Sequence, residues 1–245
     1  MTNFNQIGDA NLLAFKDNVR RAEVVAKKQE ILDSIGVFHN LVPTTVLCVG
    51  FSSFLFASFK TPVAVTGISK EAHDYLISQQ IKFTYIPESD IDKYQKKFQV
   101  VIAADEYFTY ADSDQEQKDN VSRICNLATE YVITTLRDYK NQDYKDREFS
   151  QPSVVRTVAD STIFLENHTW DPRDRSSWNS IIYAILQGVN KLLSFGPFAR
   201  RTMYFKQLAN FSATAGATSF LVHKNLMYKG LVRKNYEHVI TIKFD

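Results

Sequence analysis

The sequence predicts an α/β fold in which a mostly parallel sheet is covered by helices on both faces. Three observations lead to this: five short apolar runs of strand length, helical patterns between them, and two further strand-like runs at the C-terminus. Alternating strands and helices indicate βαβ units, whose buried strands form nearly continuous apolar runs. A chain of 245 residues buries a substantial core. We expect a three-layer domain of seven strands, the last two forming an antiparallel hairpin.

The N-terminus is expected to form a helix over residues 10–36. Apolar residues recur there at steps of three and four, and Gly36 stands where a C-terminal cap is common. We treat residues 1–41 as a cover helix that precedes the α/β domain of residues 42–245.

The parallel strands are apolar runs rich in β-branched residues. They are expected at residues 44–50, 62–68, 81–86, 98–104 and 131–136. Helices are expected between them, at residues 52–59, 69–80 and 112–128. Ser69 is the expected N-cap of the second of these helices.

An insertion, at about residues 145–195, interrupts this alternation before the last helix. Its beginning is polar, and two strands, 154–166 and 178–186, are expected around the turn-like residues 171–177. A helix at 198–215 and the closing strands at 219–227 and 238–244 complete the predicted domain.

The composition excludes several classes of protein. Hydrophobic residues make up 44% and charged residues 23%, which excludes disordered, collagen-like and coiled-coil chains. Glycine is scarce: 8 of 245 residues is under half the usual share of about 7%, so Gly-rich phosphate loops are not expected. Cys48 and Cys125 have no nearby Cys or His partner and are expected in the core. Without a secretion signal or a membrane-length apolar run, the expected location is cytoplasmic.

Charge is distributed unevenly along the chain. Residues 105–119 contain six acids and one base, whereas residues 200–238 contain seven bases and one acid. The seven bases are Arg200, Arg201, Lys206, Lys224, Lys229, Arg233 and Lys234. They form either an ordinary solvated surface or a contact for nucleic acid or an acidic protein partner.

Glycine and polar residues follow the first four strands, where ligands bind in open α/β sheets. The segments are VLCVGFSSF at 46–54, VTGIS at 65–69, TYIPESD at 84–90 and VVIAADEYF at 100–108. In this order, followed by a fifth strand and a closing hairpin, they resemble the class I S-adenosylmethionine-dependent methyltransferases. The resemblance covers about residues 42–245. It implies five parallel strands and an antiparallel terminal pair.

The resemblance also implies an S-adenosylmethionine site at Gly50, Ser52, Ser53 and Glu88. Gly50 keeps the first glycine of the cofactor loop, and Ser52 replaces the second. Glu88 stands where the family has an acid that accepts from the adenine amino group. At the end of strand two, Gly67-Ile68-Ser69 provides no acid for the ribose hydroxyls.

Two other positions in the motif segments differ from the family pattern. Cys48 stands where an acid is common, and Phe54 stands at the third glycine of the loop. Phe54 either packs within its helix or fills part of the cofactor pocket.

Asp105 and Tyr107, at the end of strand four, are the implied catalytic residues, beside which the methyl acceptor would lie. A second interpretation assigns Asp105 and Glu88 to helix caps or solvated loops, and Ser52 and Ser53 to an N-cap. The sequence contains no P-loop, G-x-S-x-G, H-E-x-x-H or paired-Cys motif, so no metal site is predicted.

Two tryptophans, Trp170 and Trp178, flank the predicted turn of the insertion, together with Asp171 and Arg173. Loops with aromatic residues and arginines are frequent recognition elements, and these tryptophans could stack on nucleic acid. The alternative is a turn whose tryptophans pack on the sheet.

Two functions therefore stay open. The first is a divergent methyltransferase acting on an unidentified acceptor. The second is a catalytically inactive, methyltransferase-like binding or assembly module, since fold does not dictate function. The composition, rich in Tyr and Phe and poor in Gly, is reminiscent of bacteriophage proteins.

Overall fold

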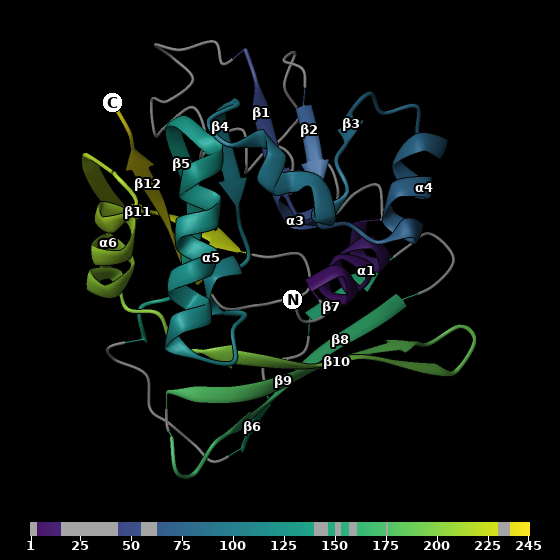
Figure 1. The fold of residues 1–245 in the computed structure, drawn as a ribbon. Coiled ribbons are helices and arrows are strands. Elements are labelled where there is room, and N and C mark those ends of the chain that lie inside the picture. Colours follow the sequence, from purple (N-terminus) through teal and green to yellow (C-terminus); the bar gives the residue numbers. More distant parts are fainter. Residues whose placement is uncertain are drawn as a thin grey trace.

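Two β-sheets and the helices that pack on them make up the fold (Figure 1). It is seen in a computed structural model that describes residues 4–15, 44–54, 63–139, 147–149, 153–156, 161–174, 176–229 and 236–245. The larger sheet has seven strands and the smaller, inserted sheet has five.

The seven-stranded sheet has the order β11-β12-β5-β4-β1-β2-β3. Its strands are β1 (Val46–Val49), β2 (Val63–Thr66), β3 (Thr84–Tyr85), β4 (Phe98–Ala103), β5 (Ala128–Leu136), β11 (Ser219–Lys229) and β12 (Tyr236–Lys243). The first five are parallel, and β12 runs antiparallel to both β5 and β11. The predicted fold class, with its antiparallel C-terminal pair, is confirmed.

Helices pack on both faces of this sheet, and its central strands are therefore buried on both sides. Along β1, Cys48 packs in the cluster that includes Leu76 of α4, whereas Leu47 packs in the cluster that includes Ile124 of α5 and Leu208 of α6. The helices are α1 (Phe4–Phe15), α3 (Phe51–Phe54), α4 (Lys70–Ser78), α5 (Asp114–Leu127) and α6 (Phe205–Thr214), with the 3₁₀ turns η1 (Glu88–Tyr94) and η2 (Tyr107–Thr109). The predicted cap of α4 is confirmed, since Ser69 Oγ accepts from the Ala72 N–H at 3.0 Å.

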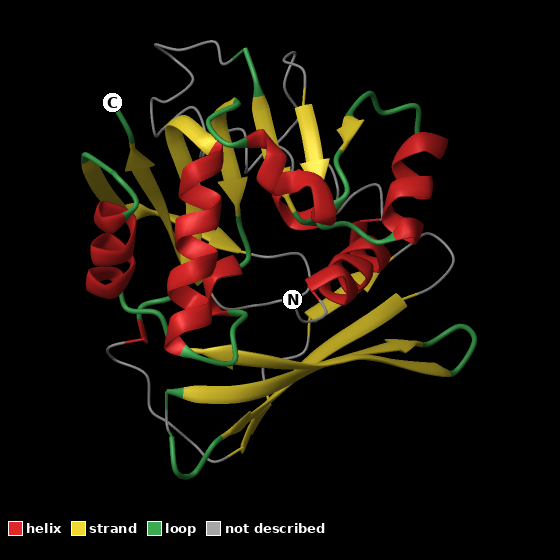
Figure 2. Cartoon of the chain, viewed as in Figure 1, coloured by secondary structure: helices red, strands yellow, loops and turns green. Residues whose placement is uncertain are grey.

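The inserted sheet is antiparallel and lies across the carboxyl ends of the parallel strands. Its order is β10-β9-β8-β6, with β7 also paired to β8. The strands are β6 (Arg147–Phe149), β7 (Ser153–Arg156), β8 (Ser161–Trp170), β9 (Ser177–Leu186) and β10 (Lys191–Arg201). In Figure 1 the arrowheads of β2 and β4 point toward α1 and this sheet, and Figure 2 shows its long strands below the helices. The described part of α1 contacts α3, α4, β9 and β10.

The insertion and the helix after it differ from their predicted form. The sequence predicts an insertion with a single pair of strands. The single pair is wrong, because five strands form a sheet of their own. The helix expected from residue 198 begins at Phe205. Residues 198–201 instead continue β10, where Phe198 pairs with Ser180 and Arg200 with Trp178. Pairing with β9 and burial of alternate residues therefore override the local helical pattern.

The N-terminal helix begins earlier than predicted, at Phe4. The rest of the expected helix, including Gly36, lies outside the described residues, as do residues 55–59 of the helix expected at 52–59. Cys48 and Cys125 are both buried, as expected for core cysteines. In the part of the chain that is described, no helix is long and apolar enough to cross a membrane.

Candidate functional site

The chain leaves β4 through two consecutive residues with a left-handed backbone. The φ angles are +60° at Asp105 and +54° at Glu106. Residues other than glycine rarely adopt this conformation, which costs about 1–3 kcal/mol for each and recurs at functional sites. The side chains are 2% and 0% exposed. Two carboxylates are thus buried at the carboxyl edge of the seven-stranded sheet.

Asp105 faces the N-terminal helix. Its Oδ2 accepts a hydrogen bond from Asn11 Nδ2 at 3.0 Å, and Asn11 is 1% exposed. This contact ties α1 to the end of β4 and holds one oxygen of the Asp105 carboxylate in place.

Helix α1 bridges the sheet edge and the inserted sheet through two further contacts. The carboxylate of Asp9 accepts from the hydroxyl of Ser69, which follows β2. The Oε1 of Gln6 accepts from the Gly196 N–H of β10 at 3.0 Å. Burial raises the pKa of Asp9, against the hydrogen bond from Ser69, which lowers it. The helix therefore covers the ends of both β2 and β4.

Glu106 faces the inserted sheet and accepts hydrogen bonds from three side chains. Arg137 donates to both oxygens, at 3.0 and 2.6 Å, and Tyr139 donates to Oε1 at 2.5 Å. Arg200 of β10 donates to Oε2 at 2.8 Å and to Thr109 Oγ1 at 2.7 Å. Burial disfavours the charge on Arg137, but Glu106 outweighs it and raises the pKa of Arg137 above its usual value. This network joins the two sheets.

The network continues along the inner face of the inserted sheet. Arg200 Nη1 lies 3.5 Å from Glu166 Oε1, and His168 Nε2 lies 3.2 Å from the same oxygen. The Arg200 guanidinium also lies over the Trp178 ring, 5.1 Å from its centroid. Arg200 is therefore a buried cation held by two acids and an aromatic ring.

The expected cofactor loop brings the ends of β1 and β2 together. Gly50 has φ +81°, and its N–H donates to the Thr66 carbonyl at 2.8 Å. Gly67 has φ +64°, and a Cβ added there would lie 3.6 Å from Gly50 N. Glycine at position 67 suits this left-handed turn, which an acidic residue would strain. The left-handed backbone at residue 67 is therefore consistent with a glycine in place of the ribose-binding acid.

Of the two loop serines, Ser53 has a defined contact. Its Oγ accepts from the Ala104 N–H at 2.8 Å, and its side chain is 0% exposed. This bond fixes α3 against the end of β4. The side chains of Ser52 and Phe54 lie outside the described residues, so the question whether Phe54 fills the cofactor pocket does too.

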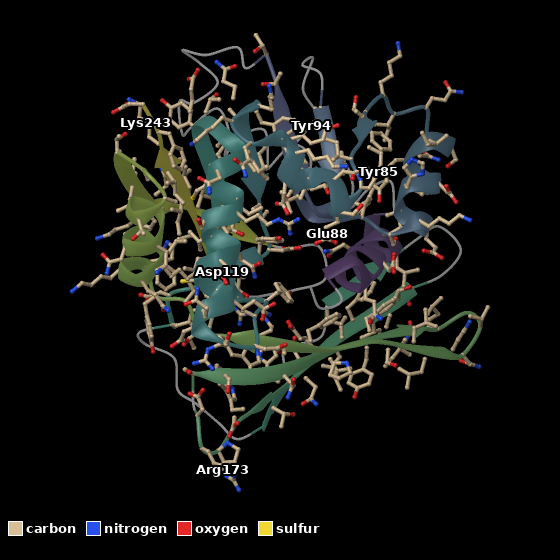
Figure 3. The ribbon with its side chains drawn as sticks, in the orientation of Figure 1. Tyr85, Glu88, Tyr94, Asp119, Arg173 and Lys243 are labelled. Atoms are coloured by element: carbon tan, nitrogen blue, oxygen red, sulfur yellow. The ribbon has the colours of Figure 1, made fainter. Side chains whose placement is uncertain are left out.

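Glu88 and Tyr107 lie together on the α5 side of the sheet edge. They line a cavity of about 20 Å³ with Thr66, Gly67 and Arg123, among others. Arg123 donates hydrogen bonds to the Glu88 carbonyl at 3.1 Å and to the Asp92 carboxylate at 2.6 Å. Glu88 is labelled in Figure 3. Burial raises the pKa of the Tyr107 phenol, which stays protonated. A space this small holds about one water, so adenine enters only if Tyr107 or Arg123 moves.

The structure thus divides the predicted site residues into two groups. Gly50, Ser53 and Asp105 lie at the ends of β1 and β4, whereas Glu88 and Tyr107 share the small cavity. Sequence analysis missed Asn11 and Arg200 as partners of the two carboxylates. Their contacts span 94 residues each, and no sequence pattern marked either pair.

The residues expected to contact a partner are partly engaged within the chain. Trp170 and Trp178 pack against each other with ring centroids 4.5 Å apart and are 4% and 3% exposed. Of the basic C-terminal residues, Arg200 is buried and Arg201 pairs with Asp114 and Asp174. Partner binding through these regions stays a prediction.

Comparison with known proteins identifies the fold. No protein-family model matches the chain, and no curated protein matches it. Among solved structures, one similar to it is SAM-bound CalS10, an amino pentose methyltransferase from Micromonospora echinaspora, with TM-score 0.66, 9% identity and coverage of 90% of this chain and 91% of CalS10. The chain has the class I methyltransferase fold.

Two further methyltransferases show the same likeness. One is an S-adenosylmethionine-dependent methyltransferase from Clostridium acetobutylicum, with TM-score 0.64, 13% identity and coverage of 94% and 96%. The other is the sugar N-methyltransferase KedS8 from Streptoalloteichus, with TM-score 0.62, 10% identity and coverage of 90% and 87%. The inserted sheet runs from residue 147 to residue 201, which is more of the chain than any of these comparisons leaves uncovered. At least part of the insertion is therefore covered by the likeness.

Proposed function

We propose that the chain is an S-adenosylmethionine-dependent methyltransferase. The observation that carries the proposal is the strained, buried turn at Asp105, which lies at the carboxyl edge of a methyltransferase sheet, beside the Gly50 turn. Ligands of open α/β sheets bind at this edge. The likeness to SAM-bound CalS10 along nine tenths of both chains supports the same assignment.

The cofactor would be held by Gly50, Ser52, Ser53 and Glu88. The left-handed turn at Gly50 has no Cβ where the amino-acid end of the ligand would approach the backbone. Glu88 would accept from the adenine amino group once Tyr107 or Arg123 has moved. The bound cofactor supplies a methyl group on a sulfonium, and transfer from it requires chiefly alignment of the acceptor.

Asp105 would position the acceptor, and we take an amine as the acceptor class. CalS10 is an amino pentose methyltransferase and KedS8 is a sugar N-methyltransferase. A buried carboxylate suits an amine because it accepts a hydrogen bond from the nitrogen and stabilises positive charge that develops on it. Tyr107 lies with Glu88 at the small cavity, so it would act on cofactor binding rather than on the acceptor.

Methyl transfer tests the proposal directly. The protein is incubated with methyl-labelled S-adenosylmethionine and a panel of small amines, with the matching alcohols as controls. We expect label in an amine, and a loss of at least about 100-fold in Asp105→Asn, as is typical when a positioning charge is removed. Asp119→Asn, an exposed site on α5, should keep full activity. Cofactor binding without transfer to any acceptor would contradict the enzyme assignment.

A second candidate is an inactive binding or assembly module. The cavity of about 20 Å³ beside Glu88 and the glycine at position 67 favour it, because both weaken contact with the adenosine. Its partner would be a nucleic acid or an acidic protein, bound through exposed bases such as Lys206 and Lys224. A bacteriophage origin and a cytoplasmic location stay predictions.

A further inference from the structure

The outward face of the inserted sheet is apolar where a solvated face would be polar. Successive residues of a strand point to opposite faces, and antiparallel sheets usually turn apolar residues to the core and polar residues to solvent. On β9, Ile182 and Ala184 are buried on the inner face. Ile181, Tyr183 and Ile185 therefore point outward, and Ile185 is 39% exposed. Strand β9 is thus apolar on both of its faces.

The strands on either side of β9 extend this apolar face. Ile185 pairs with Ile163 of β8 and with Leu192 of β10, and Leu192 is 62% exposed. Two residues along β9, Tyr183 pairs with Leu165 of β8. The outward apolar residues, which we call the insertion face, are Ile163, Leu165, Ile181, Tyr183, Ile185 and Leu192. Contiguous apolar patches on a protein surface mark interaction sites.

The insertion face carries no formal charge. Among residues 161–169, 177–186 and 192–199, the single Asp, Glu, Lys or Arg is Glu166. Its side chain is buried on the inner face, 3.5 Å from Arg200. Nucleic acids, acidic proteins and anionic membranes are attracted by basic groups. The insertion face therefore fits a neutral, apolar partner surface.

The helices that the structure describes leave the insertion face open. In Figure 2 they lie on the other side of the inserted sheet. Helix α1 contacts β9 and β10 from that inner side, where Ala10 and Leu12 belong to the same core cluster as Ile182 and Phe198. An apolar face of this kind is expected to be covered by another molecule.

We propose that the insertion face binds a second copy of this chain. A two-fold axis buries the same patch on both copies, so a neutral apolar face meets its own equivalent. The axis would pass near Tyr183, which lies between Ile181 and Ile185 in the outward row of β9. Aromatic residues are enriched at the centres of such interfaces. The proposal does not depend on cofactor binding or methyl transfer.

The size of the face agrees with what a stable dimer needs. Strands β8, β9 and β10 have 10, 10 and 11 residues, and β6 and β7 add a fourth strand position beside β8. At about 3.3 Å per residue and about 4.8 Å between strands, four positions cover about 600 Å² in projection. Side chains that project from the sheet bring the accessible area toward the roughly 800 Å² that each partner of a standard interface buries.

Sedimentation velocity of the full chain, without cofactor, tests the proposal. At micromolar concentration we expect a species of twice the 28.1 kDa of one chain. Ile185→Glu places a charge in the interface of both copies and should weaken dimerisation at least about 100-fold. Leu221→Glu, at a leucine of β11 that is 53% exposed, is the matched control and should dimerise as the wild type does.

Two results of this experiment would overturn the proposal. One is a chain that stays monomeric at high micromolar concentration, including a monomer that binds phosphatidylcholine vesicles, which would assign the face to lipid. The other is wild-type dimerisation by Ile185→Glu, which would place the dimer interface elsewhere.

Cross-linking locates the interface without introducing a charge. Packed sheets lie about 10 Å apart, so a bis-maleimide of that length should join Tyr183→Cys of the two copies. Cys48 and Cys125 are buried and should not react. We expect covalent dimers from Tyr183→Cys and none from Leu221→Cys. Equal yields from the two variants, or no covalent dimer from Tyr183→Cys, would overturn the proposal.

Discussion

The two neighbouring carboxylates after β4 share a strained turn but face different regions of the molecule. Asp105 lies against α1 through Asn11, while Glu106 binds two arginines and a tyrosine that join the seven-stranded sheet to the inserted sheet. Charge–charge contacts of this kind, buried within a protein, are costly to break. The difference assigns Glu106 to the structure of the interface and leaves Asp105 for function.

The largest expected effect comes from Arg200→Ala. Removing this cation leaves Glu106 and Glu166 as buried acids with less compensation, which should lower the free energy of unfolding by about 3–5 kcal/mol. Arg201→Ala removes partly exposed pairs with Asp114 and Asp174 and should cost about 1 kcal/mol or less. Urea unfolding measures both. Equal losses in the two variants would mean that the buried network does not stabilise the interface.

Glu106→Gln and Asp105→Asn test the division between the two carboxylates. Glu106→Gln keeps the shape but removes the charge that two arginines share, at an expected cost of about 2–3 kcal/mol. Asp105→Asn should change stability by less than about 1 kcal/mol, because asparagine also tolerates the left-handed backbone. Chemical denaturation of both variants is the measurement. A larger loss in Asp105→Asn would reverse the assignment.

Ser53→Ala should have a moderate effect. The change leaves the buried Ala104 N–H without its acceptor, at an expected cost of about 1–2 kcal/mol. The control is Ser113→Ala, which removes a cap at the exposed start of α5. Thermal unfolding of the two variants compares the loss of a buried hydrogen bond with the loss of an exposed one. Unchanged stability in Ser53→Ala would show that α3 is not fixed to β4 through this hydroxyl.

The smallest expected effect concerns pH and Asp9. Burial raises the folded-state pKa of Asp9 above 3.8. The protonated carboxyl therefore adds to the free energy of unfolding below the unfolded-state pKa, and this stabilisation is lost as pH rises through the folded-state pKa. Because the group is half-buried, we expect a loss well under about 1 kcal/mol. Asp9→Asn should match the protonated wild type near pH 3 and exceed the wild-type melting temperature slightly at pH 7. A lower melting temperature at pH 7 would contradict the sign.

The parts of the fold that sequence analysis could predict are those with one simple pattern. β1 and β4 are buried along nearly all of their length and are followed by glycine or acid, so the strands could be predicted, and with them the positions of Gly50 and Asp105 at the sheet edge. β10 could not, because its inward residues include Arg200, whose partner Glu106 is 94 residues away. Asn11 was missed for the same physical reason, since long-range pairing decides its role.

The central claim is that the carboxyl edge between Gly50 and Glu88 holds the adenosyl cofactor. Calorimetric titration of S-adenosylhomocysteine into the full chain tests it most directly, with Glu88→Ala as the partner variant. The account predicts one-to-one binding by the wild type and at least about ten-fold weaker binding by Glu88→Ala, since a charged acceptor is lost. No heat and no thermal shift at millimolar ligand would contradict the claim.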